Sequence, residues 1–213
     1  MTPVIGVEVW LVDLARDGAR LAAMAEAREL LNAADRVRHA AYRDPADAEA
    51  FAASRAALDL VLSRYANKPL ERIQRARSGK PFASGLPIFS LSHTAEDAVV
   101  AVAAEGAIGV DIEREGDRDP RHPLIERIAS LLPPAKRPLL VAWTVAEAWA
   151  KFHGMRLADL LDSTGQGRVL EEAITGIGPP VLAQLQLPKA LVGCCWHMIA
   201  GTTPVVRPLE IPA

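Results

Sequence analysis

The sequence predicts an α+β protein that divides into two lobes. Half of its 213 residues are hydrophobic and 23% are charged, a composition typical of globular proteins with one large core or two smaller ones. Segments that alternate apolar and polar residues lie among segments with helical periodicity, which indicates strands mixed with helices. We expect lobes of about 100 residues each. The first would span residues 1–105 and the second residues 106–213.

The first lobe begins with a strand pattern and contains a long helix with an apolar stripe. In the segment around Phe51, apolar side chains recur with the helical period, and Arg55 lies at the edge of that stripe. We expect helices at Leu21–Ala34 and Asp47–Tyr65, and strands at Val7–Leu14, Ile73–Arg77, Ile88–Ser92 and Val99–Ala103.

The second lobe is expected to start near Ala107 with an acidic strand that contains Gly109–Glu113. Two helical patterns come next, and apolar segments of strand character end the chain. We expect helices at His122–Leu132 and Ala135–Phe152, followed by strands at Arg168–Ala173, Val181–Leu187, Leu191–Ala200 and Val205–Ile211.

Two acidic motifs in the second lobe indicate chemistry. Strand side chains alternate between faces, so Asp111 and Glu113 share one face of the expected strand. Residues four apart share one side of a helix, so Glu147 and Lys151 form a stripe together with Trp143. If strand and helix pack together, three carboxylates and one ammonium converge, which suits a hard cation such as Mg²⁺.

Each motif also has an ordinary structural explanation. An Asp-x-Glu strand is commonly the solvated face of a sheet, and a Glu and a Lys four residues apart commonly form a helical ion pair.

Basic residues and a histidine occupy defined places in the first lobe. Arg55 needs a partner at the edge of an apolar stripe, either an acid or a phosphate, unless its charged end extends into solvent. Lys80 stands in a turn between Gly79 and Pro81, and His93 ends an alternating strand, where a structural role is the commoner one. An upstream cluster holds further positive charge: Arg36, Arg38, His39 and Arg43.

Composition excludes several classes of function. The net charge of −2 argues against a general nucleic-acid binder. No run of roughly eighteen apolar residues and no export signal is visible, so we expect no membrane segment and a cytoplasmic location. Cys194 and Cys195 are adjacent, and we expect both to be reduced and structural.

Taken in order, these motifs resemble the Sfp-type 4′-phosphopantetheinyl transferase family, from about Arg36 to Leu157. Four segments carry the resemblance: Gly79-Lys80-Pro81, Phe89-Ser90-Leu91-Ser92-His93-Thr94, Gly109-Val110-Asp111-Ile112-Glu113, and Trp143-Thr144-x-x-Glu147-Ala148-x-x-Lys151.

The resemblance implies a post-translational modification with a holo-[acyl-carrier-protein] synthase activity. The phosphopantetheine arm of coenzyme A would pass to a serine of an acyl or peptidyl carrier protein, with release of 3′,5′-adenosine diphosphate. The implied fold has two similar lobes in a pseudo-twofold arrangement with the active site in the cleft between them. The implied partners are coenzyme A and the carrier, and the implied state is a monomer.

The resemblance also implies roles for individual residues. The metal ligands for Mg²⁺ would be Asp111, Glu113 and Glu147, with Glu147 also a candidate base and Lys151 a neutraliser of phosphate charge. Contacts with the phosphates of coenzyme A would come from a basic and hydroxyl set: Arg36, Arg38, Arg55, Lys80, Ser92, His93 and Lys151.

Two positions depart from the family pattern. Ala146 replaces the usual lysine of the helix motif, and Arg156 replaces a glycine downstream of it. We hypothesise that Arg156 restores the missing positive charge. A degenerate member that binds coenzyme A or a carrier without transfer stays an alternative, as does an unrelated Mg²⁺-dependent phosphoester hydrolase. The charged segment Arg114–Pro123 would either contact the carrier or be a solvated connector.

Overall fold

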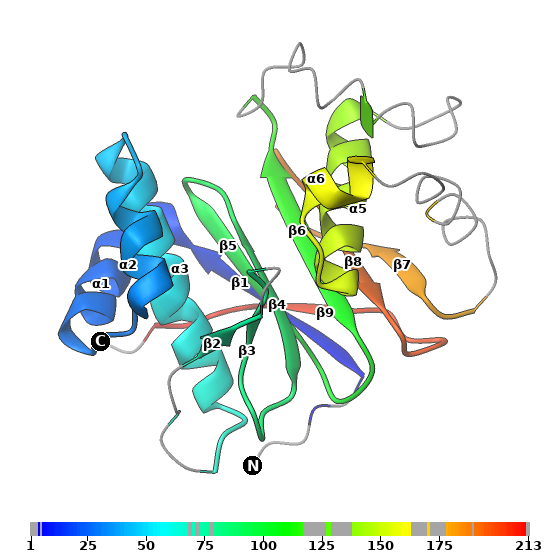
Figure 1. The fold of residues 1–213 in the computed structure, drawn as a ribbon. Helices are drawn as coiled ribbons and strands as arrows, with labels where there is room; N and C mark the ends of the chain where they lie inside the picture. The colour runs from blue at the N-terminus through cyan, green and yellow to red at the C-terminus, as the bar shows by residue number, and fades with distance from the viewer. Residues whose placement is uncertain are drawn as a thin grey trace.

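The computed structural model describes residues 4, 6–67, 70, 73–76, 79–116, 127–128, 138–162, 170, 178–188 and 190–211 (Figure 1). Within them the chain forms a mixed α+β fold with a four-stranded, a three-stranded and a two-stranded sheet. The α+β prediction is confirmed. The two larger sheets differ in strand number and connection, and a pseudo-twofold relation between lobes stays a prediction.

The four-stranded sheet has the order β4 (Ile88–His93), β5 (Asp97–Ala103), β1 (Val7–Asp13) and β9 (Val205–Pro208). Its strands are antiparallel except for β1 and β9, which are parallel. The last strand of the chain therefore returns to the sheet that the first 105 residues build. The proposed division at residues 105 and 106 stays a prediction.

Helices α1 (Leu14–Ala27) and α3 (Pro45–Ser63) cover one face of this sheet, and α2 (Ala33–Ala40) packs on α3 (Figure 1). Each is capped by an Asp or Asn side chain that accepts a hydrogen bond from a first-turn amide. Buried alanine, leucine and valine side chains of α1 and α3 pack against the sheet. The expected helix Leu21–Ala34 was wrong in extent, because Asp13 starts α1 earlier and Asn32 starts a separate helix.

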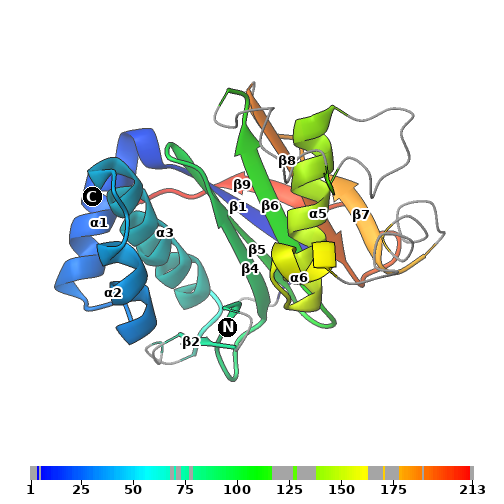
Figure 2. The same ribbon diagram turned by 45° about the horizontal axis from the view of Figure 1, so that its top comes forward.

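The three-stranded sheet has the order β6 (Ile108–Arg114), β8 (Leu191–His197) and β7 (Val181–Gln184), all antiparallel. Val110 and Ile112 pack with residues of β1 and β5 in a core between the two sheets. Helix α5 (Leu139–His153) covers the other face of this sheet, and the short α6 (Leu157–Asp162) follows it. The layers therefore run helix, sheet, sheet, helix (Figure 2).

Gly109 permits the close approach of α5 to β6. A Cβ at this position would lie 2.1 Å from the carbonyl oxygen of Ala148 and 2.4 Å from the amide nitrogen of Phe152. Any larger residue would push the helix away from the strand. The strand and the helix that carry the two acidic motifs therefore lie directly against each other, which is the condition for their charged side chains to converge.

A short hairpin completes the described fold. Strands β2 (Gln74–Arg75) and β3 (Pro81–Phe82) pair antiparallel, so the expected strand Ile73–Arg77 is shorter than predicted and has a partner that was not expected. The expected helix His122–Leu132 and the segment Arg114–Pro123 lie largely outside the described residues.

Of the expected strand Arg168–Ala173 only Leu170 is described, and it is helical, which contradicts a strand at that residue. No helix in the described part of the chain is long and apolar enough to cross a membrane.

Candidate active site

A cavity of about 380 Å³ opens where the edge strands β4 and β6 lie side by side. One side is formed by α2, α3, the β2–β3 hairpin and β4, and the other by β6, α5 and the start of α6. The cavity brings together nine of the ten predicted site residues: Arg38, Arg55, Lys80, Ser92, His93, Asp111, Glu113, Glu147 and Lys151.

Arg36 is the predicted residue that does not line this cavity. It is exposed, and its guanidinium donates to the carbonyl of Leu31 at 2.7 Å. Residues two apart on a helix point in nearly opposite directions, so Arg38 faces the cavity and Arg36 does not. The position of Arg36 gives no support to the expected phosphate contact.

Hydroxyl side chains join the two edge strands at the cavity floor. Ser90 Oγ accepts from the amide of Val110 at 3.1 Å, and Ser92 Oγ donates to Asp111 Oδ1 at 2.7 Å. Lys80 Nζ donates to the carbonyl of Ile108 at 2.8 Å. The residues of β4 therefore alternate between two faces. The apolar Phe89 and Leu91 pack toward the helices, and the hydroxyls of Ser90 and Ser92 face β6.

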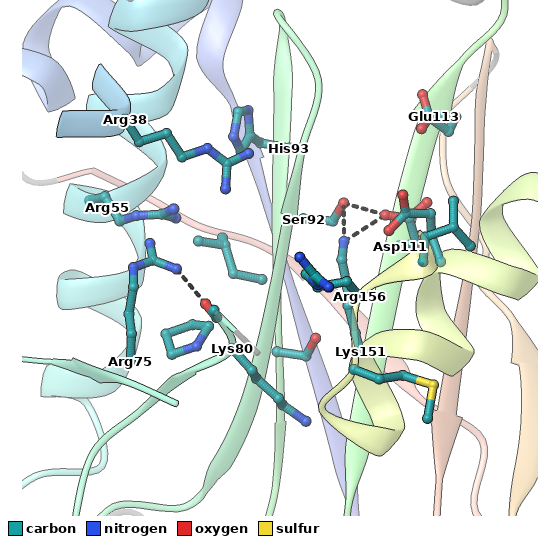
Figure 3. Close-up of a pocket in the computed structure, with 17 residues that line it drawn as sticks. Arg38, Arg55, Arg75, Lys80, Ser92, His93, Asp111, Glu113, Lys151 and Arg156 are labelled. Carbon is teal, nitrogen blue, oxygen red and sulfur yellow. Dashed lines mark hydrogen bonds and ion pairs between the residues drawn. The ribbon is translucent and has the colours of Figure 1, made fainter. Parts of the chain in front are cut away.

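The acidic side of the cavity centres on the pair of Asp111 and Lys151 (Figure 3). Lys151 Nζ lies 2.7 Å from Asp111 Oδ1 and 3.0 Å from Ser92 Oγ. Burial favours the neutral amine, but the negative charges of Asp111, Glu147 and Glu113 outweigh it and raise the pKa of Lys151. Three carboxylates therefore act on one ammonium, as the sequence predicts.

The oxygen ligands on this side fit a hard cation, although they do not form a ready-made three-ligand site. Among the described residues, no three His, Cys, Asp or Glu side chains are grouped closely enough to hold a metal. Asp111 Oδ2 is buried and has no hydrogen-bond partner within the described part of the chain. Mg²⁺ commonly needs only one or two carboxylates besides water and phosphate oxygens, so Asp111 with Glu113 or Glu147 suits it chemically.

The basic side is built around Phe51 and Arg55. The guanidinium carbon of Arg55 lies 4.3 Å from the ring centroid of Phe51, and that of Arg38 lies 5.4 Å from it. Arg55 Nε also donates to Asp35 at 3.4 Å, so Arg55 has an acidic partner and still lines the cavity. Burial and the nearby Arg75 lower the pKa of Arg55 to about 10, which leaves it charged at neutral pH.

His93 and Lys80 lie between the two sides and have lowered pKa values. Burial and the charge of Arg55 lower the pKa of His93 to about 4, so its ring is neutral at physiological pH. Burial and repulsion from Lys151 lower the pKa of Lys80 to about 8. Lys80 is therefore mostly charged at pH 7, whereas His93 can offer a hydrogen bond but no positive charge.

Two further lining residues, Arg75 and Ser90, were missed as site residues at the level of sequence. Arg75 pairs with Pro81 across the β2–β3 hairpin, which brings its guanidinium to the basic side (Figure 3). Its only sequence signal is its place shortly before the Gly79-Lys80-Pro81 turn. Ser90 could have been found from the strand pattern, because it shares a face with Ser92.

The two departures from the family pattern have clear structural positions. Ala146 is fully buried in the core between α5 and its sheet, so its methyl group does not face the cavity. Arg156 lines the cavity, and its Nη2 contacts Asp159 Oδ1 at 2.6 Å. The left-handed residue that ends α5 is Gly154, with φ 65°, and Arg156 does not need that conformation.

Six basic side chains and three carboxylates thus line one cavity. Arg38, Arg55, Arg75 and Lys80 come from the β4 side, whereas Lys151 and Arg156 come from the β6 side, which also carries the three carboxylates. No protein-family model matches the chain, and no curated protein matches it either. A functional interpretation therefore depends on the motifs and on the geometry of this cavity.

Proposed function

We propose that the protein transfers the 4′-phosphopantetheine arm of coenzyme A to a serine of an acyl or peptidyl carrier protein. The observation that carries the proposal is the division of a single cavity into a basic side and a carboxylate side. Coenzyme A presents a phosphate monoester and a pyrophosphate, so it needs cations at two places. A metal-assisted transfer needs carboxylates beside only one of them.

The basic side would bind phosphate through a set of fixed donors. Arg38 and Arg55 are stacked on Phe51, and Arg75 lies beside them, so their forks are held before a ligand arrives. Neutral His93 would add a single hydrogen bond. Lys80 would meet the phosphates from the cavity floor.

The carboxylate side would carry out the transfer. The serine hydroxyl of the carrier would attack the phosphorus atom that bears the pantetheine arm, and Glu147 would accept the hydroxyl proton directly or through a water. The bond from this phosphorus to the bridging pyrophosphate oxygen would break. Lys151, kept charged by its carboxylate neighbours, would neutralise the departing 3′,5′-adenosine diphosphate.

The co-substrate chemistry implies a divalent cation on the same side. Asp111, together with Glu113 or Glu147, would hold Mg²⁺, which when bound supplies charge neutralisation on the pyrophosphate. Asp111 would contribute the buried oxygen that has no hydrogen-bond partner in the described residues.

The proposal extends to the architecture and setting of the protein. The cavity between the two sheets would be the cleft between the two pseudo-twofold lobes of the family. The protein would act as a monomer in the cytoplasm, with coenzyme A and a carrier protein as its partners.

Intact-mass spectrometry tests the proposal. Apo carrier proteins from fatty-acid, polyketide and nonribosomal-peptide pathways are incubated with coenzyme A, Mg²⁺ and either the wild type or Glu147→Gln. We expect one carrier class to gain a single phosphopantetheinyl group with the wild type only. If no carrier gains mass while coenzyme A still binds in calorimetry, transfer is rejected in favour of a binding module.

A further inference from the structure

Asp35 lies behind the basic side of the cavity without lining it. It stands in the first turn of α2, where its amide donates to the capping Asn32 at 2.9 Å, and it is only 3% exposed. Its Oδ1 atom accepts from Arg55 Nε at 3.4 Å and from Arg75 Nε at 3.0 Å. Arg75 adds a second hydrogen bond to the same oxygen through Nη2.

Arg75 extends this contact to the turn that carries Lys80. Its Nη1 donates to the carbonyl of Gly79 at 2.6 Å. The turn is closed by backbone bonds of 2.9 Å from Gly79 N to Ala76 O and from Ala76 N to Lys80 O. One buried carboxylate thus contacts two arginines that are 20 residues apart in the sequence, and through Arg75 it is connected to the turn that carries Lys80.

The charges of Arg55, Arg75 and Asp35 favour the binding of an anion in the cavity. Two partly buried arginines, Arg55 and Arg75, share a single carboxylate, and both also line the cavity, so positive charge is left over on the cavity side. Without Asp35 the two guanidiniums would repel each other at the side of the cavity that both line. The carboxylate holds them close while staying out of contact with the ligand.

We propose that Asp35 is a positioning residue for phosphate binding: it orients Arg55 and Arg75 and, through Arg75, the turn that presents Lys80. The identity of the ligand as coenzyme A rests on the proposed function. The positioning role rests only on the geometry and charge of the cavity.

The sign of the effect of Asp35→Asn separates positioning from simple electrostatics. Removing a carboxylate near an anion site should strengthen binding if only charge matters, because one repulsion is lost. If Asp35 orients the arginines, affinity for coenzyme A should instead fall about tenfold or more, since charge-assisted hydrogen bonds are lost. Calorimetric titration at fixed ionic strength measures the dissociation constant.

Asp59→Asn provides a matched control. Asp35 and Asp59 both line a second, smaller cavity, which Arg55 and Arg75 also line. Asp59 pairs with Arg28 at 3.5 Å, and Arg28 does not line the larger cavity. We expect the affinity of Asp59→Asn for coenzyme A to stay within about twofold of the wild type, because surface ion pairs contribute little. Equal or tighter binding by Asp35→Asn would overturn the proposal.

A double-mutant cycle covers the case in which Asp35→Asn unfolds part of α2. Adding Asp35→Asn to Arg75→Gln should cost much less affinity than it costs in the wild type, because the two residues act through one contact. Thermal unfolding of all variants shows whether they are folded at the assay temperature. Fully additive losses in folded variants would contradict the proposal.

Two probes identify the phosphate and separate this proposal from the proposed function. A penalty seen with coenzyme A but not with dephospho-coenzyme A assigns the arginines to the phosphate monoester, and a penalty with both assigns them to the pyrophosphate. Inorganic pyrophosphate serves as a probe that is independent of transfer. One outcome separates the two proposals: the wild type binds pyrophosphate, Asp35→Asn weakens that binding, and no carrier is modified. In that case the positioning role of Asp35 is supported and phosphopantetheinyl transfer is rejected.

Discussion

The two sides of the cavity hold opposite charges by the same device. On the basic side two partly buried arginines, Arg55 and Arg75, share the carboxylate of Asp35, which leaves positive charge for a ligand. On the other side the carboxylates of Asp111, Glu147 and Glu113 act on the ammonium of Lys151 and raise its pKa. An internal counter-ion thus joins the like charges of each cluster.

Gly109→Ala should have the largest effect, because it forces apart the strand and the helix that carry the carboxylate side. The new Cβ would meet backbone atoms of α5 at 2.1 and 2.4 Å, which no rotamer change can relieve. We expect the free energy of unfolding to fall by about 3 kcal/mol or more in urea titrations.

Gly18→Ala is the control for this substitution. Gly18 lies within α1, and a Cβ there meets its nearest atom, Glu49 Oε1, at 3.6 Å, an ordinary contact. Alanine favours helix over glycine, so stability should stay equal or rise by up to about 1 kcal/mol. A similar loss in both variants would contradict the assigned role of Gly109.

Glu147→Gln tests whether the carboxylate side carries the chemistry, because it removes the proposed base and retains its shape. We expect kcat for carrier modification to fall by about 10²- to 10⁴-fold, the usual contribution of a general base. Coenzyme A affinity measured without metal should change little, because the basic side is untouched. A kcat within about threefold of wild type would remove Glu147 from the chemistry.

Arg55→Gln tests the basic side in the same manner. Its loss should raise the dissociation constant for coenzyme A about 10- to 100-fold, since hydrogen bonds to charged groups are lost in a buried setting. The kcat at saturating coenzyme A should be much less affected. A loss confined to kcat would place Arg55 with the chemistry and contradict the two-sided description.

The lowered pKa of Lys80 predicts that the affinity for coenzyme A depends on pH. Its pKa of about 8 means that the ammonium is present below pH 8 and is lost above it, while the raised pKa of Lys151 keeps that neighbour charged. Affinity for coenzyme A should therefore fall several-fold as the pH rises above 8. Lys80→Arg should flatten the profile between pH 7 and 9.5, because arginine stays charged. An identical slope in both proteins would exclude Lys80 as the titrating group.

Arg156→Ala should have the smallest effect. Its guanidinium is exposed and already held by Asp159, so its contribution to the cavity is partial. If it replaces the missing positive charge, the apparent Michaelis constant for coenzyme A should rise about two- to fivefold. An unchanged constant would rule out the compensation.

The carboxylate side could be predicted from sequence because its signals are local. Strand alternation puts Asp111 and Glu113 on one face, and helical spacing aligns Glu147 with Lys151. Packing of the strand on the helix then brings them together, and Gly109 marks that contact.

The basic side could be predicted only in part, because its contacts join residues far apart in the sequence. Separating Arg38 from Arg36 requires knowing that a helix starts at Ala33, and the expected single helix concealed that start. Arg75 lies on a strand of only two residues, too short for a periodic signal. Asp35 acts through partners 20 and 40 positions away, so no local pattern marks it.

The most direct test of the central claim is release of 3′,5′-adenosine diphosphate from coenzyme A, followed by chromatography in the presence of Mg²⁺. The reaction is run with an apo carrier that the mass screen identifies, with the same carrier lacking its acceptor serine, and without carrier. We predict release in equal amount to carrier modification, and only with the intact serine. Release without a carrier, or no release with any carrier, would contradict the assignment of this cavity to phosphopantetheinyl transfer.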